Sequence, residues 1–562
     1  MIYTMNRIGA TLAGALAAVV ALGAAGDLRL IEAIKSERSQ EAATLIRQRV
    51  GLDATEADGS TALHWAAQLN RPDLVKSLLE AGANANVKTR YGVAPLTLAC
   101  VNGSAAVVEL LLARGADPGV ANEEGATALM TCARTGRVDA IRPLLARGAD
   151  VNAVERFRGQ TALMWAAAEN NAEAATLLVE AGASVNAKSR AGFTALLLAV
   201  RGGGIETARA LLGAGANVND AAPDGTSALG MSVINAQYAT TLFLLENGAD
   251  PNARDPRGSV LHTLAWMRKP GASPSAGAGG SPTGPPPSLD NVDTLDVARA
   301  LLKHGADPNR RVDWREQRYH RDFGQQKLPP DIPIGRKYMS YVGATPFYVA
   351  AQNGDYQYMK VLAEGGADTK MPTHQNITPL MAAAGIGYWD GESPGPHAGP
   401  VPEAERLEAV KLALELGNDI NARADFGAFP IEGDGEYLLL YYPKNLDEIT
   451  DKVPSDVRWT MSTALHGAVV SGQLSIVKFL VEHGAEIDAR NRLGWTPVMV
   501  ADGIFVSNTK KEFPDIGVYL RQVMKQRGMT VPPAGANASQ VVRARAASFD
   551  KEPEPGTSAS RP

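Results

Sequence analysis

The sequence is poor in the residues from which enzyme active sites and metal centres are usually built. It has two cysteines and eight histidines in 562 residues, and it lacks the Cys-x-x-Cys, Cys-x-x-Cys-His and His-Glu-x-x-His spacings of common zinc and haem sites. A nucleophile elbow and a phosphate-binding glycine loop are also missing. Asp390, Glu392 and His397 can be drawn as a metal trio, but their loose spacing and the intervening prolines make a poor ligand set. We therefore expect no enzymatic activity, no cofactor and no metal.

The sequence also has no excess of positive charge and little in the way of long apolar runs. The formal net charge is −5, so no general basic field attracts nucleic acid, although basic and aromatic residues alternate over 310–337. One apolar run, 8–25, follows Arg7 and ends in small residues, as in an export signal. It is short for a bilayer span. Residues 1–25 therefore predict a periplasmic or secreted protein that leaves the membrane after cleavage, with an uncleaved anchor as the alternative.

What the sequence does contain is a repeat. Successive glycines lie 33, 33, 34, 33, 33 and 33 residues apart: Gly59, Gly92, Gly125, Gly159, Gly192, Gly225 and Gly258. A fixed period in this range predicts stacked helical units, none of which buries its apolar face alone.

Each unit has the signals of two helices. A threonine placed to cap the first helix recurs at Thr61, Thr127, Thr161, Thr194, Thr345, Thr378, Thr463 and Thr496. The second helix carries paired leucines such as Leu144-Leu145, and it stops at glycines suited to a left-handed C-terminal residue, such as Gly148. This pattern places Leu145 in the core.

The motifs resemble the ankyrin repeat. Gly-x-Thr-Ala-Leu-His at 59–64, its copy at 461–466 with Met461 in place of Gly, and Gly-Ala-Asp-Val-Asn at 148–152 carry the resemblance. It implies an all-α repeat solenoid of helix-turn-helix units joined by short finger turns, with structural hydrogen bonds from His64 and His466 and, in the same register, His262.

The repeat frame also suggests how the chain is divided. We expect an export signal (1–25), an N-terminal capping repeat (26–57), regular repeats (58–268), repeats with long inserts (269–493), a C-terminal capping repeat (494–530) and a disordered tail (531–562). Cys100 and Cys132 fall on neighbouring first helices. Since packed helices lie ~10 Å apart, they are expected to be buried free thiols, not a disulfide.

Long inserts interrupt the second half. Three breaks, 270–289, 387–402 and 503–513, fall between the two helices of a repeat, whereas 310–342 and 428–460 fall in fingers. The first finger insert is mainly basic, and the second is acidic over 431–456. This pairing predicts that the two fold together or hold one partner between them, and two separately solvated loops are the alternative. Ten of the fourteen tyrosines lie over 319–442, which fits either a recognition surface or small satellite cores.

These features predict an exported, monomeric protein-binding scaffold of a bacterial-type cell, which does not bind nucleic acid. The family resemblance implies contacts from the finger positions and the exposed end of each first helix. The candidates are Arg90, Tyr91, Val93, Phe157, Arg158, Arg190, Phe193 and Arg257 in regular repeats, and Trp314, Arg315, Arg318, Tyr319, Phe323, Tyr341, Tyr388, Trp389 and Trp459 in the inserts. The alternatives are a small-molecule or cofactor-binding protein with a pocket under the aromatic inserts, and an effector delivered to a host cell.

Overall fold

A computed structural model describes residues 26–268, 290–312, 319–320, 325–326, 343–386, 402–425, 460–491, 494–506 and 509–535. The chain forms two compact units, Met1–Pro223 (unit 1) and Asp224–Pro562 (unit 2). The predicted export segment 1–25 and most of the predicted tail lie outside the described residues. Within the described part, no helix is both long and apolar enough to cross a bilayer.

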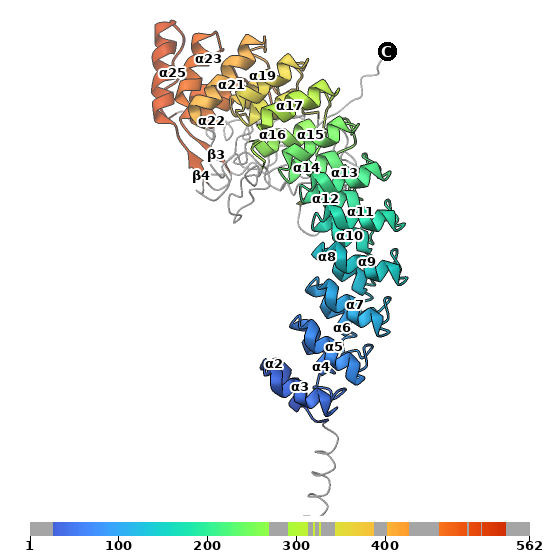
Figure 1. Ribbon diagram of the computed structural model, residues 1–562. Coiled ribbons are helices and arrows are strands. Elements are labelled where there is room, and N and C mark those ends of the chain that lie inside the picture. The colour runs from blue at the N-terminus through green and yellow to red at the C-terminus, as the bar shows by residue number, and fades with distance from the viewer. Residues whose placement is uncertain are drawn as a thin grey trace, which may run out of the picture. The chain divides into compact units, whose positions relative to one another are not determined.

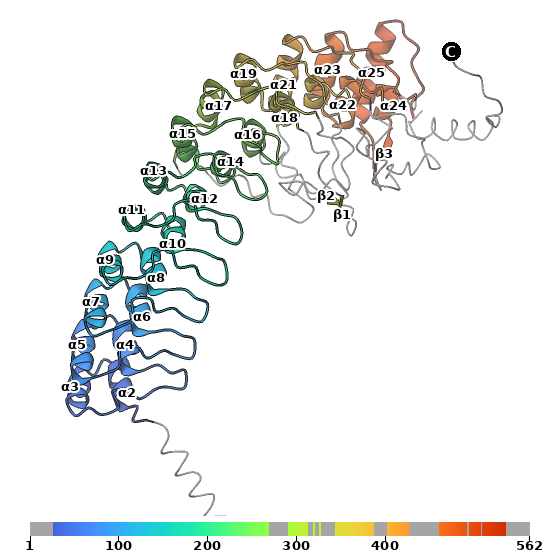
Figure 2. The ribbon, with the colours of Figure 1, turned by 90° about the vertical axis from the view of Figure 1, so that its right-hand side faces the viewer.

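Unit 1 is a stack of helix pairs in two layers, with the fingers leaving from the side of the first helices (Figures 1 and 2). The first helices are α2 (Arg29–Lys35), α4 (Ala62–Gln68), α6 (Pro95–Val101), α8 (Ala128–Thr135), α10 (Ala162–Ala168) and α12 (Ala195–Arg201). The second helices are α3 (Ser39–Arg47), α5 (Pro72–Ala81), α7 (Ala105–Ala113), α9 (Val138–Ala146), α11 (Ala172–Glu180) and α13 (Ile205–Gly213). The predicted all-α repeat solenoid is confirmed.

Unit 2 continues the same pattern of helix pairs. Its first helices are α14 (Ala228–Ile234), α16 (Val260–Arg268), α18 (Pro346–Gln352), α20 (Pro379–Ala383), α22 (Ala464–Val470) and α24 (Pro497–Ala501). Its second helices are α15 (Tyr238–Glu246), α17 (Thr294–Lys303), α19 (Tyr356–Glu364), α21 (Glu403–Glu415), α23 (Leu474–Glu482) and α25 (Pro514–Gln526). The five inserts fall between these helices where the broken period places them.

Two small hairpins of unit 2 have no counterpart in the predicted all-α pattern. Strands β1 (Tyr319–His320) and β2 (Gln325–Gln326) pair antiparallel, as do β3 (Ile504–Val506) and β4 (Thr509–Lys511). The second hairpin occupies the break between α24 and α25.

The capping threonines start the first helices as predicted. Three histidines in these helices also form hydrogen bonds with the backbone of the next repeat. In α4, the Nδ1 atom of His64 accepts a hydrogen bond from the backbone N–H of Thr61 (3.2 Å), and Nε2 donates to the carbonyl of Val93 (3.1 Å). His262 and His466 reach the carbonyls of Ala344 and Trp495, each at 3.1 Å. The predicted structural role of the histidines is confirmed.

The expectation of free thiols is wrong, because Cys100 and Cys132 form a disulfide between α6 and α8. Their Cα atoms are 4.5 Å apart and both residues are fully buried. The spacing of ~10 Å applies to helix axes. Residues that face each other across the contact are closer, since each Cα lies about 2.3 Å from its axis. Small neighbours such as Ala99 and Ala133, both fully buried, let the two backbones approach.

Leu145 is not the fully buried core residue that the leucine pattern predicts. Leu144 has no exposed surface, whereas Leu145 is only partly buried. With Leu177 it lines an open groove between α9 and α11. In α11 the leucine pair is displaced by one position toward the N-terminus relative to the terminal glycine, so Val179 stands where other repeats carry the second leucine.

We therefore expect Leu145→Ala to lower the free energy of unfolding of unit 1 by about 1 kcal/mol, against ~2–5 kcal/mol for a fully buried leucine. Urea unfolding followed by circular dichroism measures the loss, with Leu144→Ala as the matched variant. Equal losses for the two variants would show that Leu145 is packed as tightly as its neighbour.

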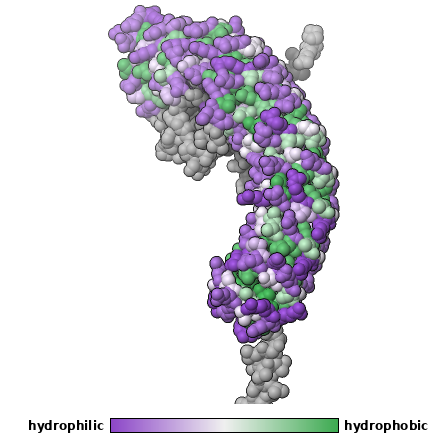
Figure 3. Space-filling model, viewed as in Figure 1, coloured by the Kyte–Doolittle hydropathy of each residue, from purple (hydrophilic) through white to green (hydrophobic). Residues whose placement is uncertain are grey.

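Apolar side chains fill the contacts between the two helices of a pair and between successive pairs. In unit 2 the core takes up Tyr348 and Tyr358, both fully buried, with Phe347 beside them. These two tyrosines belong to helices α18 and α19 of the stack itself, so they form neither a recognition surface nor a satellite core under an insert. The face in Figure 3 is mainly hydrophilic, with hydrophobic residues interspersed among the hydrophilic ones.

Candidate protein-interaction site

The fingertips of unit 1 are joined by backbone hydrogen bonds. The N–H groups of Arg90, Glu123, Arg156 and Arg190 donate to the carbonyls of Asp58, Tyr91, Glu124 and Arg158 at 2.8, 3.3, 2.6 and 2.9 Å. Each bond connects one finger to the preceding finger. We call this series the fingertip ladder. It fixes the spacing of the side chains that the tips display.

A buried carboxylate shapes the finger at 155–160. Glu155 is only 5 % exposed, and its oxygens accept hydrogen bonds from the backbone N–H groups of Phe157 (2.6 Å), Arg158 (2.7 Å) and Gln160 (2.9 Å). Burial alone would raise the pKa of Glu155, but these donors and the charge of Arg190 outweigh it and lower the pKa. The carboxylate is therefore ionised at neutral pH, and it holds the tip turned outward.

Large apolar side chains stand on these tips. Phe157 is 75 % exposed, Val154 is 56 % exposed and Tyr91 is 55 % exposed. The guanidinium of Arg90 lies 4.8 Å from the centre of the Tyr91 ring and donates to its hydroxyl at 2.7 Å. Exposed aromatic and arginine side chains on a rigid backbone are the residue types enriched in protein-binding hot spots.

The first helices add two tryptophans that the sequence analysis missed. Trp65 and Trp165 occupy the same position, four residues after the capping threonine, and both are partly buried. The indole N–H of Trp65 donates to Glu56 (2.6 Å) and Lys35 lies 4.5 Å from its ring, while Arg134 lies 5.3 Å from the ring of Trp165. Their shared position in the repeat is the sequence feature from which these two site residues could have been predicted.

The predicted contact residues of unit 1 fall into two groups. Arg90, Tyr91, Phe157, Arg158 and Arg190 are exposed on the fingertips, and Val93 and Phe193 are partly buried beside them. The structure thus brings these positions to one series of fingers. Their contact with a partner stays a prediction.

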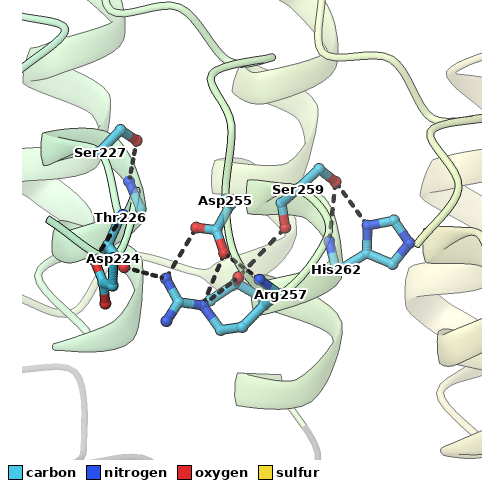
Figure 4. Close-up of polar contacts among 9 residues, drawn as sticks. Asp224, Thr226, Ser227, Asp255, Arg257, Ser259 and His262 are labelled. Carbon is cyan, nitrogen blue, oxygen red and sulfur yellow. Dashed lines mark hydrogen bonds and ion pairs between the residues drawn. The ribbon is translucent and has the colours of Figure 1, made fainter. Parts of the chain in front are cut away.

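The prediction that Arg257 contacts a partner is wrong, because Arg257 is buried in its finger in unit 2 (Figure 4). Its guanidinium pairs with Asp255 at 2.9 Å, and it also donates to the hydroxyls of Thr226 (3.1 Å) and Thr263 (3.2 Å). The arginine side chain is 8 % exposed and the aspartate side chain is fully buried. A guanidinium held in this way is part of the core and cannot meet a partner.

The predicted contacts in the inserts have no described side chains. Trp314, Arg315, Arg318, Phe323, Tyr341, Tyr388, Trp389 and Trp459 lie outside the described residues, and for Tyr319 only the strand is described. The predicted pocket under the aromatic inserts and the pairing of the two finger inserts fall there as well. Among the described residues, no three His, Cys, Asp or Glu side chains are grouped as a metal site would require.

Comparison with known families agrees with the fold. Residues 30–122, 108–189 and 185–255 match the family described as ankyrin repeats (3 copies), and residues 465–501 match ankyrin repeats (many copies). These segments of the chain are ankyrin repeats. Ankyrin repeats are generally non-enzymatic and imply a role in protein–protein interaction.

The chain is similar to short parts of several proteins. It is 44 % identical over 69 residues to human protein phosphatase 1 regulatory subunit 27. The aligned segment covers 12 % of this chain and 39 % of that protein. Over 86 residues it is 34 % identical to the E3 ubiquitin-protein ligase KEG of Arabidopsis thaliana (14 % and 5 %), and over 60 residues 32 % identical to the ankyrin repeat protein OPG189 of variola virus (11 % and 11 %). The match thus spans well under half of each relative.

Proposed function

We propose that this chain is a non-enzymatic scaffold that binds a protein partner through the fingertips and the first-helix face of unit 1. The observation that carries the proposal is the display of Phe157 and Tyr91, 75 % and 55 % exposed, on tips that the fingertip ladder holds in place. Because the backbone is already ordered, binding loses little conformational entropy. A regulatory role, as the name of the human relative states for that protein, is one form that such binding takes.

We further propose that the chain is exported from a bacterial-type cell to the periplasm or the medium. Two observations support this location. The apolar segment 8–25 follows Arg7 as in an export signal, and Cys100 and Cys132 form a disulfide, a bond that persists in oxidising compartments and is rare in the cytosol. Titration of thiols in the protein taken directly from cells tests the location. Two reactive thiols after unfolding would count against export.

Crosslinking and capture from the native source test the binding function. The bait is the full chain, compared with a Tyr91→Ser, Phe157→Ser variant and with a control in which the exposed Val518 of α25 is changed to Ser. One protein captured by the wild type and the control, and lost with the fingertip variant, is the expected result. Equal capture by all three would show that the partner binds elsewhere than the fingertips, and capture by none would contradict the scaffold function.

A further inference from the structure

Three arginines lie on the finger of Phe157 and on the next finger, and Phe157 is the most exposed aromatic residue among those that the structure describes in unit 1. Arg156, Arg158 and Arg190 are exposed, as is Phe157 between the first two. We call these four residues the arginine fingertip. Within the part of the chain that the structure describes, none of the three guanidinium groups forms a salt bridge, whereas Arg114 and Arg209 of the same unit do so with Glu80 and Glu206.

The buried carboxylate of this finger offsets the charge of the patch only in part. Glu155 is buried, and its oxygens are occupied by the N–H groups of Phe157, Arg158 and Gln160. Its charge attracts that of Arg190, but among the described residues it forms no salt bridge with any of the three guanidinium groups, which face solvent. The patch presents positive charge with its hydrogen-bond donors free for an anionic ligand, which is how arginines recognise carboxylates.

The two adjacent fingers that carry the arginine fingertip are in close contact. The N–H of Arg190 donates to the carbonyl of Arg158 (2.9 Å). Gly159, at φ 66°, leaves no room for a side chain, since a Cβ there would lie 2.7 Å from Cγ of Arg190. A backbone hydrogen bond of this kind brings two backbones to about 5–6 Å, as in a β-ladder. Residues two positions apart in an extended peptide lie on the same face, about 7 Å from each other. Arg158 and Arg190 therefore match two acidic residues two positions apart.

We propose that the arginine fingertip binds an acidic, extended peptide segment of the partner protein, with carboxylates on Arg158 and Arg190 and an apolar side chain against Phe157. The inference rests on the proposed protein-binding function and names the chemistry of the partner. A short peptide fits better than a nucleic acid. Glu123 and Glu124, exposed on the preceding finger, limit the basic patch and repel a polyanion that extends past it, and the whole chain carries a net charge of −5.

Selection from a displayed library of random 12-residue peptides against the full chain tests the proposal. Anisotropy titrations with the selected peptides then compare the wild type with an Arg158→Glu, Arg190→Glu variant. An Arg142→Glu, Arg209→Glu variant is the matched control, because it makes the same charge change on exposed residues of α9 and α13. Arg158→Gln, Arg190→Gln replaces the first variant if its thermal unfolding differs from that of the wild type.

The expected peptides are rich in Asp and Glu around one aromatic or aliphatic residue. Their affinity should fall at least 10-fold in the fingertip variant and less than 2-fold in the control. Their affinity for the wild type should also fall at high salt. Neutral or basic peptides, or acidic peptides that bind both variants equally, would overturn this inference. The scaffold function would still stand if capture of a protein is lost with Tyr91→Ser, Phe157→Ser. Tighter arginine-dependent binding of a single-stranded oligonucleotide or of phosphatidylglycerol vesicles would overturn it in favour of a polyanion.

Discussion

Acidification from about pH 7.5 to pH 5 is expected to lower the free energy of unfolding of unit 2 by about 4 kcal/mol. Burial lowers the pKa of both His262 and His466 from the ordinary 6.5 to about 4. Below pH 6.5 the unfolded chain therefore takes up protons that the folded chain excludes. The stabilising effect of the neutral rings is complete above pH 6.5 and disappears progressively toward pH 4, by about 2 kcal/mol for each histidine at pH 5.

The hydrogen bonds explain why the folded state excludes the proton. In His466, Nε2 faces the carbonyl of Trp495 and must donate, whereas Nδ1 faces the backbone N–H of Thr463 (3.2 Å) and must accept. A second ring proton would point at that donor in a fully buried site. His64 in unit 1 has the same partners in Thr61 and Val93, and burial lowers its pKa too.

Urea unfolding at the two pH values measures this loss. Changing both His262 and His466 to Gln should lower the stability at pH 7.5 but leave a much smaller difference between pH 7.5 and pH 5. His304→Gln is the control, because His304 is exposed at the end of α17. Carboxyl groups titrate mainly below pH 5, so they contribute little in this window. A pH dependence unchanged by the double substitution would contradict the assignment to these two residues.

Replacement of Arg268 by Met is expected to destabilise unit 2 by about 3–5 kcal/mol, the usual cost of leaving a buried charge without its partner. Arg268 ends α16, and its guanidinium pairs with Asp355 before α19 at 2.7 Å. The two side chains are 9 % and 2 % exposed. Arg268 also donates to the hydroxyl of Thr294 in α17 and lies 5.5 Å from the centre of the Tyr358 ring. One side chain thus connects three helices.

A double-mutant cycle separates the pair from the packing. Arg268→Met combined with Asp355→Asn should be less destabilised than Arg268→Met alone, because the uncompensated carboxylate is gone and the amide oxygen still accepts from the N–H of Tyr358 (3.2 Å in the native chain). Arg299→Met is the matched control, since its ion pair with Asp296 is exposed and surface pairs contribute little. Additive losses would mean that Arg268 acts through its aliphatic stem.

The period of the sequence was sufficient to predict the helix pairs, because the signals that start and stop each helix are local. Thr61 and Gly82 illustrate this: the first starts α4 and the second follows α5 at a positive φ of 101°. The disulfide was not predictable in the same way. It depends on which faces of α6 and α8 meet, and a spacing between helix axes does not contain that information.

In the candidate site, too, a residue's environment was predictable where the signal is local in the sequence and not where it depends on the fold. Arg257 and Arg158 both lie one position before their finger glycines, Gly258 and Gly159. They differ in the residue two places earlier, which is Asp255 before Arg257 but Arg156 before Arg158. The aspartate draws its arginine into the finger, so the burial of Arg257 had a sequence signal. The environment of Glu155 had none, since three backbone donors converge on it only in the folded tip.

The connections of Arg268 also point to a place where we expect the chain to accept an insertion. Residues on both sides of the 269–289 segment are tied together, Arg268 to Thr294 and to Asp355. These bonds hold the ends of the segment together. Lengthening a loop with fixed ends costs about 0.6 kcal/mol of closure entropy for each doubling. A fluorescent protein or an affinity tag spliced between Arg268 and Asp290 should therefore leave both flanking helices in place, giving a reporter for the scaffold that keeps the fingertips unmodified.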